Sequence, residues 1–157
     1  MVDKIGFGSI GVGAIAKTHA YALSKSSKCY FAGAYDMNKE RVEAFCKENG
    51  GKAYDKLEDF LKDENIQVVV IATPSGLHHD LAIAALRAKK HVIVEKPLEI
   101  TVERCNDIIE EGKKQGRLVG GVFQSRFYEA PRLVKKALEE GRFGKLTMVE
   151  ASVKWFR

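Results

Sequence analysis

Apolar positions follow two different periods along the first 122 residues of the chain. Short apolar runs rich in β-branched residues, such as Val68-Val69-Val70-Ile71, are typical of strands buried on both faces. Between these runs lie stretches with apolar residues about four positions apart, such as Leu81 and Ala85, which predict amphipathic helices. We expect strands at residues 4–10, 29–35, 67–72, 91–94 and 118–123. We expect helices at residues 14–24, 39–49, 56–62, 78–89 and 102–115.

This alternation of strands and helices predicts an α/β fold with a parallel sheet and helices on both of its faces. Because crossovers between parallel strands are right-handed, we expect a doubly wound Rossmann sheet in the order 3-2-1-4-5-6. The strand at 67–72 counts as the fourth, and no separate run marks the third.

Polar residues and glycines mark where some of these helices begin and end. Asp55 is placed to cap the helix at 56–62, and Thr101 is placed to cap the helix at 102–115. Gly116 should end that second helix, with Ile108 and Ile109 facing the sheet.

The pattern changes after Phe123. Residues 130–140 predict a helix with Pro131 in its first turn. Residues 145–154 then alternate between polar and apolar, which predicts a long strand with one mostly apolar face. A single strand cannot bury that face alone. We therefore expect a dinucleotide-binding domain at 1–122 and the incomplete start of an α+β substrate or oligomerisation domain at 123–157.

Composition and charge narrow the class of protein. Of the 157 residues, 45% are hydrophobic and 30% charged, as in soluble globular proteins, and no apolar run reaches the length of a membrane span or a signal peptide. Most of the net charge of +5 lies in residues 101–157, which hold 12 Lys/Arg against 8 Asp/Glu. These interspersed charges fit solvated helix faces or attraction for a phosphorylated ligand, and they form no basic stripe for nucleic acid.

Three scattered cysteines, with no CxxC pair, predict neither a disulfide framework nor a zinc site. A reducing cytoplasm is the simplest setting for them. The adjacent pair His78-His79 is a poor metal site, because neighbouring helical residues point about 100° apart. We expect no bound metal, and His78 or His79 instead caps a helix or contacts a cofactor.

A glycine-rich loop follows the first expected strand. Two registers fit a dinucleotide fingerprint, and we favour Gly11-x-Gly13-x-x-Ala16 over the one that begins at Gly6, which leaves almost no strand upstream. Gly11 makes the tight turn, Gly13 lets the backbone approach a pyrophosphate, and Ala16 allows close helix packing. Ala14 and Ile15 then open a helix whose free N–H groups and dipole favour the pyrophosphate.

An acid lies at the end of the second expected strand. Asp36 follows Ala16 by 20 residues, where a carboxylate accepts hydrogen bonds from both adenosine ribose hydroxyls and repels a 2′-phosphate. This position favours NAD over NADP, although the nearby Lys39 and Arg41 leave NADP possible. The alternative is that Asp36 caps the helix at 39–49.

Two further loops end strands at the edge where parallel sheets bind ligands. One begins Thr73-Pro74-Ser75, and the other begins Glu95-Lys96-Pro97. Pro97 holds Lys96 extended, so its ammonium could contact a substrate hydroxyl over a nicotinamide and take part in proton transfer. The alternative is a solvated lysine in a turn.

Three segments together resemble the Gfo/Idh/MocA oxidoreductases, the family of glucose–fructose oxidoreductase and inositol dehydrogenase. They are Gly11-Val12-Gly13-Ala14-Ile15-Ala16 with His19, Ala72-Thr73-Pro74-Ser75 with His78, and Lys90-His91-Val92-Ile93-Val94-Glu95-Lys96-Pro97-Leu98. The resemblance implies a two-domain NAD(P)-dependent dehydrogenase of sugars or cyclitols, with Lys96 as the catalytic residue beside the nicotinamide and substrate. It also implies that Thr73, Pro74, Ser75, His78 and Glu95 line the cofactor side.

The resemblance extends past the sixth strand. Gln124 and Arg126 lie where the family crosses into its substrate domain, so Gln124 is a candidate to contact the cofactor and Arg126 a substrate anion, unless Arg126 is a surface charge. Residues 126–157 are similar to dehydrogenases that oxidise the 3-hydroxyl of UDP-N-acetylhexosamines or their uronates. A sugar or sugar-nucleotide substrate is therefore expected.

One departure from the family matters for catalysis. Family members are about twice as long, and their second domain supplies an acid/base His, often with an Asp nearby, whereas every His here lies within the first 91 residues. We expect a truncated chain or fragment whose full-length form is a homo-oligomer through its C-terminal sheet. The alternative functions are an NAD-binding module without activity, or a methyltransferase using S-adenosylmethionine, which would leave Glu95-Lys96-Pro97 without a role.

Overall fold

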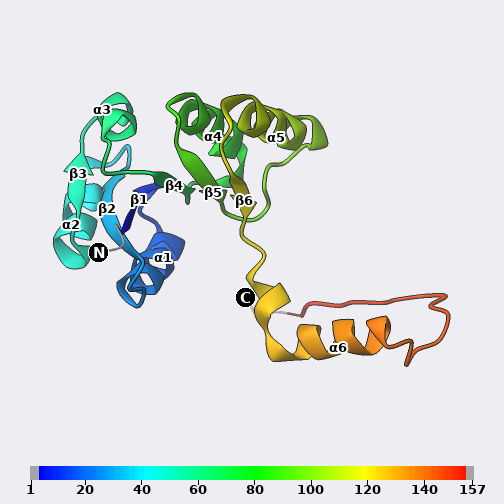
Figure 1. Cartoon of the computed structure of the whole chain (residues 1–157). Coiled ribbons are helices and arrows are strands. Elements are labelled where there is room, and N and C mark those ends of the chain that lie inside the picture. Colours follow the sequence, from blue (N-terminus) through cyan, green and yellow to red (C-terminus); the bar gives the residue numbers. More distant parts are fainter. Residues whose placement is uncertain (1–3, 155–157) are drawn as a thin grey trace. The chain divides into compact units, whose positions relative to one another are not determined.

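A computed structural model describes residues 4–154 of the chain (Figure 1). The backbone divides into two compact units at the boundary between Val122 and Phe123. Each unit is described by itself. No helix among residues 4–154 combines the length and hydropathy needed to cross a membrane.

The first unit contains one parallel sheet of six strands. The strands are β1 (Ile5–Ile10), β2 (Cys29–Tyr35), β3 (Lys52–Tyr54), β4 (Val68–Ile71), β5 (His91–Val94) and β6 (Val119–Gly121). Their order is β3-β2-β1-β4-β5-β6, which confirms the predicted doubly wound Rossmann topology.

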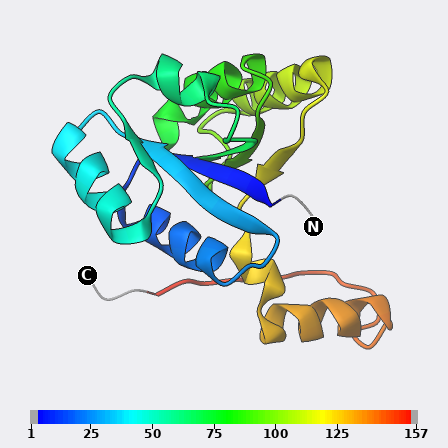
Figure 2. The same ribbon diagram turned by 60° about the vertical axis from the view of Figure 1, so that its left-hand side comes forward.

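Helices cover both faces of this sheet (Figure 2). They are α1 (Ala14–Ser24), α2 (Lys39–Asn49), α3 (Leu57–Lys62), α4 (His78–Arg87) and α5 (Val102–Gln115), with a short 3₁₀ turn, η1 (Ser75–Leu77), before α4. Alternate residues of β4 face opposite cores: Val69 and Ile71 pack with α3, α4 and α5, and Val70 packs with α1 and α2. The continuous β-branched run is therefore buried on both faces, as predicted.

In this unit two local predictions were wrong, and the position of one strand was not predicted. The third strand, which no pattern marked, is only Lys52–Tyr54. Asp55 does not cap α3, because its carboxylate instead accepts a hydrogen bond from Lys39 Nζ at 2.9 Å. Ile108 is fully buried but Ile109 is 39% exposed, since adjacent helical residues point about 100° apart and the direction that buries Ile108 turns Ile109 toward solvent.

The predicted ends of α5 are confirmed. The Thr101 hydroxyl accepts a hydrogen bond from the Arg104 N–H at 3.3 Å, and Gly116 ends the helix in the left-handed conformation with φ +64°.

The second unit contains a short 3₁₀ turn, η2 (Gln124–Phe127), and the helix α6 (Glu129–Glu139), close to the predicted helix. The strand predicted at 145–154 was wrong, because residues 140–154 form no strand. A strand needs a neighbour for its N–H and C=O groups, and the described residues of this unit contain no strand that could pair with it. The apolar alternation reaches Trp155, which lies outside the described residues.

Candidate functional site

A cleft of about 660 Å³ opens where β1, β2 and β4 end, at the carboxyl edge of the sheet. This edge is where doubly wound sheets bind ligands. Seven of the residues predicted to bind the cofactor line this one cleft: Gly11, Gly13, Ala14, Ile15, Asp36, Thr73 and Pro74. Its other walls come from the ends of the strands and from α3 and α4, including Tyr35, Met37, Leu57, Leu77 and Leu81.

Glycine is suited to positions 11 and 13 of the loop for two different physical reasons. Gly11 has φ +90°, and a Cβ there would lie 2.7 Å from Ala72 O, so only glycine fits the turn. At Gly13, the N-cap of α1, a Cβ would meet no atom within 4 Å. No protein contact therefore requires a glycine at Gly13, whereas a ligand in that open space would.

The N-terminus of α1 is suited to an anion. No side chain caps it, and its first turn holds no acidic residue. The early N–H groups of a helix have no partner within the helix, and the dipole adds positive potential there. Together with the open space at Gly13, this end of α1 fits the pyrophosphate of a dinucleotide.

The earlier glycines of β1 serve packing. A Cβ on Gly8 would lie 2.6 Å from Phe60 Cζ, and a Cβ on Gly6 would lie 1.8 Å from Asn65 O. Both lie inside the strand and not in the loop. The geometry therefore supports the register Gly11-Gly13-Ala16, in which Ala16 is buried against the sheet.

Asp36 follows β2 and is fixed beside the glycine loop. Its Oδ2 accepts a hydrogen bond from the Val12 N–H at 3.0 Å, and its Oδ1 accepts one from the Asn38 N–H at 2.9 Å. A carboxylate has further lone pairs for ribose hydroxyls. Asp36 does not cap α2, since that cap is Asn38, whose Oδ1 accepts a hydrogen bond from the Arg41 N–H at 2.9 Å.

The two cations near Asp36 have different surroundings. Arg41 lines the cleft, whereas Lys39 does not. Lys39 Nζ donates to Asp55 at 2.9 Å, and this hydrogen bond raises the pKa of the ammonium. Of the two, only Arg41 lies where it could receive a 2′-phosphate.

The Glu95–Lys96 segment follows β5 at the same edge of the sheet. Glu95 is buried, with Oε1 2.8 Å from His19 Nε2 and Oε2 accepting a hydrogen bond from the Lys96 N–H at 3.2 Å. Glu95 therefore joins the segment to α1 and does not line the cleft. The Lys96 side chain is exposed, and its ammonium has no hydrogen-bond or ion-pair partner within residues 4–154.

His78 also lies away from the cleft surface. Its side chain is 1% exposed, with Nδ1 3.0 Å from Pro97 O and Nε2 2.9 Å from Thr73 O. Ser75 begins η1 and is not among the residues that line the cleft.

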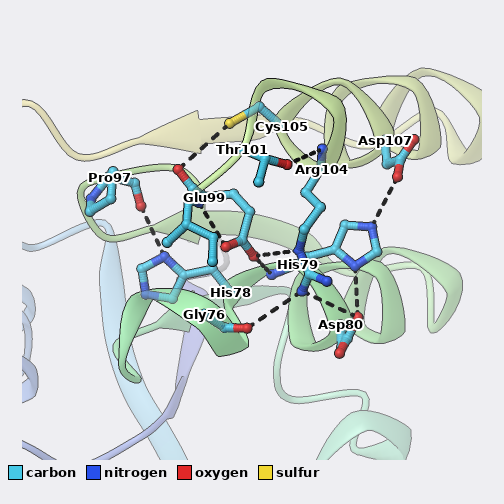
Figure 3. Close-up of polar contacts among 11 residues, drawn as sticks. Gly76, His78, His79, Asp80, Pro97, Glu99, Thr101, Arg104, Cys105 and Asp107 are labelled. Atoms are coloured by element: carbon cyan, nitrogen blue, oxygen red, sulfur yellow. Dashed lines mark hydrogen bonds and ion pairs between the residues drawn. The ribbon is translucent and has the colours of Figure 1, made fainter.

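A polar cluster ties the start of α4 to the start of α5 (Figure 3). The Glu99 side chain is fully buried, accepts a hydrogen bond from the His79 N–H at 2.7 Å and lies 3.3 Å from Arg104 Nε. Burial alone would raise the pKa of Glu99, but the N–H groups of Ile100 and His79, with the Arg104 guanidinium, outweigh it and lower the pKa. The sequence carried no signal for this cluster, because its members are ordinary charged residues of loop and helix.

The remaining histidines have structural contacts. The His79 ring lies between Asp80 Oδ1 at 2.7 Å and Asp107 Oδ2 at 3.3 Å, and His91 Nδ1 accepts a hydrogen bond from the Leu118 N–H at 2.9 Å. Across residues 4–154, no three His, Cys, Asp or Glu side chains gather in a way that could hold a metal ion.

The last two predicted residues, Gln124 and Arg126, belong to the second unit. Both lie in η2, and both side chains are exposed. Arg126 borders a cavity of about 640 Å³ in this unit, together with the basic residues Arg132, Lys135 and Lys136.

The glycine loop, the acid after β2 and the strand order define an NAD-binding Rossmann domain. Residues 5–122 match the family model of the Gfo/Idh/MocA oxidoreductases, described as an oxidoreductase family with an NAD-binding Rossmann fold. The chain belongs to this family.

Relatives in the family include several dehydrogenases. The glucose-6-phosphate 3-dehydrogenase of Bacillus subtilis is 28% identical over 98% of the chain and 43% of its own length. The myo-inositol 2-dehydrogenase of Thermotoga maritima is 32% identical over 88% of the chain and 42% of its own length. The chain thus spans less than half of the length of these relatives.

A solved structure of a dehydrogenase is similar to this chain in both fold and sequence. The WlbA dehydrogenase from Bordetella pertussis, crystallised with NADH and UDP-GlcNAcA, is 35% identical with a TM-score of 0.87. The alignment covers 90% of the chain and 44% of WlbA. The overall fold and the family are therefore established together.

Proposed function

We propose that this chain carries the NAD-binding part of a dehydrogenase that transfers a hydride between nicotinamide and a hydroxyl-bearing carbon of a sugar, sugar nucleotide or cyclitol. The observation that carries the proposal is the exposed Lys96 ammonium, which has no partner among residues 4–154. It lies on a segment fixed by Glu95, at the sheet edge that also forms the cleft. Hydride transfer to or from a carbinol carbon requires a cofactor cleft and, beside it, a group that can accept or donate a proton.

In this proposal the chain's residues have separate tasks. Gly11, Gly13, Ala14 and Ile15 hold the pyrophosphate at the N-terminus of α1, and Asp36 holds the adenosine ribose. Thr73 and Pro74 form the wall of the cofactor side. A bound NAD would supply the hydride acceptor. Lys96 would hydrogen-bond the substrate oxygen and take the hydroxyl proton as the carbinol carbon is oxidised, and it would return that proton in the reverse reaction.

The proposed substrate-binding residues belong to the second unit. The names of the relatives point to a phosphorylated sugar, an inositol or a uridine-linked uronate. We propose that residues 123–157 begin the substrate domain, with Gln124 toward the cofactor and Arg126 toward a substrate anion. We also propose a homo-oligomer built through that domain, and a cytoplasmic location, which the three free thiols favour.

NADH binding tests the cofactor half of the proposal. Fluorescence titration of the 157-residue chain should show NADH binding tighter than NADPH, because Asp36 repels a 2′-phosphate. Gly13→Ala should weaken NADH binding at least tenfold with an unchanged fold, because its Cβ meets no protein atom but fills the pyrophosphate space. Gly120→Ala is the matched control, since its Cβ would make only ordinary 3.8 Å contacts in β6 and should leave binding unchanged. Equal affinities for Gly13→Ala and wild type would contradict the assigned pyrophosphate site.

Turnover tests the catalytic half. The complete gene product should reduce NAD with one of a panel of sugars, sugar phosphates, sugar nucleotides and inositols. Lys96→Ala should lower kcat roughly 100-fold while changing the NAD affinity less than about threefold, as for a group that acts in proton transfer. Equal losses in kcat and in NAD affinity would indicate that Lys96 is a binding residue. NADH binding without turnover of any substrate would favour a cofactor-binding module.

A further inference from the structure

One buried side chain joins the two loops that carry the proposed site. His78, the first residue of α4, bridges Thr73 O, which follows β4, and Pro97 O, which follows β5. Thr73 lines the cofactor cleft, and Pro97 directly follows Lys96. Figure 3 shows the imidazole ring beneath the Pro97 loop, with Nδ1 pointing at the carbonyl.

The chemistry of this bridge excludes a role in proton exchange with a ligand. Both ring nitrogens face carbonyl oxygens, which only accept hydrogen bonds, and the ring is 1% exposed. A neutral imidazole donates to one carbonyl, and a ring with both nitrogens protonated donates to both. In either state the ring fixes the spacing between the two loops.

The rest of the Lys96 segment is fixed at other points. Glu95 joins it to His19 of α1, and Glu99 joins it to the backbone of α4 and to Arg104 of α5. The His78 bridge reaches the cleft directly, because Thr73 lines it. The Glu99 contact reaches the cleft only through a further ion pair, in which Arg104 Nη2 lies 3.6 Å from Asp80 Oδ1. The His78 ring is therefore the more direct link between the cleft wall and the residue that follows Lys96.

We propose that His78 is a positioning residue that couples cofactor binding to the placement of Lys96. Its Nε2 arm holds the cleft wall through Thr73, and its Nδ1 arm holds the Lys96 segment through Pro97. This inference rests on the proposed function, since it assigns Lys96 to the reaction and the cleft to NAD.

Two substitutions separate the two arms. The amide nitrogen of asparagine occupies a δ position like Nδ1, and that of glutamine occupies an ε position like Nε2. His78→Asn should keep the Pro97 arm, with kcat nearly unchanged and NADH affinity reduced about tenfold, as expected for one lost buried hydrogen bond. His78→Gln should keep the Thr73 arm, with NADH affinity nearly unchanged and kcat reduced roughly 10- to 100-fold through misplacement of Lys96.

Controls distinguish positioning from a purely structural role. A histidine that only fills the core would lower the melting temperature in both variants and change kcat and NADH affinity together, which would overturn the inference. His91→Asn alters a histidine that also bonds to backbone but lies at the start of β5, and it should change neither kcat nor NADH affinity. If the wild-type protein neither binds NADH nor turns over a sugar, the proposed function fails. If the wild type is active but the two His78 variants do not differ in their effects on kcat and NADH affinity, only the role of His78 is refuted.

A measurement on the wild-type chain keeps the inference testable if the variants do not fold. ADP-ribose fills the cofactor cleft without a nicotinamide, so it has no group to contact Lys96 directly. Hydrogen–deuterium exchange should then slow at the amides of Lys96 and Leu98 when ADP-ribose binds, because the cleft wall and the segment share His78. Slowed exchange around Gly13 and Thr73 alone would overturn the coupling.

Discussion

Apolar residues of one element in each unit of the chain differ in how far they are buried. In the first unit, all four residues of β4 are buried, with helices on both faces. In the second, the apolar residues Leu133, Val134 and Leu138 of α6 are 59%, 52% and 40% exposed. The pattern of a sequence shows which face of an element is apolar, but burial also requires a second element to cover that face.

The largest expected effect compares one apolar residue from each unit. Phe60 is fully buried, packs edge-on against Tyr54 with ring centroids 5.4 Å apart, and fills the space that Gly8 leaves open. Phe60→Ala should lower the free energy of unfolding by about 3–5 kcal/mol, since it removes apolar contacts and leaves a cavity. Urea denaturation followed by circular dichroism measures this change.

Leu133→Ala in α6 is the partner variant. Because Leu133 is 59% exposed, its truncation should change the free energy of unfolding by less than about 0.5 kcal/mol. A loss comparable with that of Phe60→Ala would show that the apolar face of α6 is covered in solution, and the contrast between the units would break down.

The next largest expected effect compares the contributions to stability of one glutamate from each unit. Glu99 is buried among N–H groups and Arg104, which lower its pKa below the ordinary 4.5, so its contribution to stability is present above that value and lost as pH falls through the lowered pKa. Glu99→Gln should therefore cost about 1–3 kcal/mol at pH 7, a value typical of hydrogen bonds to a charged group. Urea unfolding at pH 7 and in steps below pH 4.5 should show the difference from wild type shrinking in acid.

Glu139→Gln is the matched change in the second unit. Glu139 pairs with Lys135 at 3.5 Å, with both side chains more than 60% exposed. The substitution should cost no more than about 0.5 kcal/mol, with little change in pH dependence. A difference between wild type and Glu99→Gln that stays constant into acid would show that the Glu99 carboxylate is not the source of its stability.

Features that repeat along the chain or lie within one βαβ unit could be predicted from the sequence. The strand order followed from alternation, and Gly11, Gly13 and Asp36 followed from the spacing of one βαβ unit. β3 was missed because three residues, of which only Tyr54 is buried, give no readable period.

Features that join distant parts of the chain could not be predicted. His19 and Glu95 are 76 residues apart, and His78 and Pro97 are 19 apart, so their partners become visible only when the strands lie side by side. The failed strand at 145–154 has the same cause, because pairing depends on a neighbour and not on the segment's own alternation.

The smallest expected effect compares the N-caps of two helices of similar length. Thr101 caps α5 through its hydroxyl, whereas Tyr128 stands at the N-cap of α6 with no side-chain hydrogen bond. Thr101→Ala should lower the free energy of unfolding by about 1 kcal/mol, because the Arg104 N–H loses its acceptor. Tyr128→Ala removes no acceptor and should change it by less than about 0.5 kcal/mol, as measured by the same urea titrations. Equal losses for the two variants would mean that capping does not separate α5 from α6, and that the difference between the units lies in tertiary packing alone.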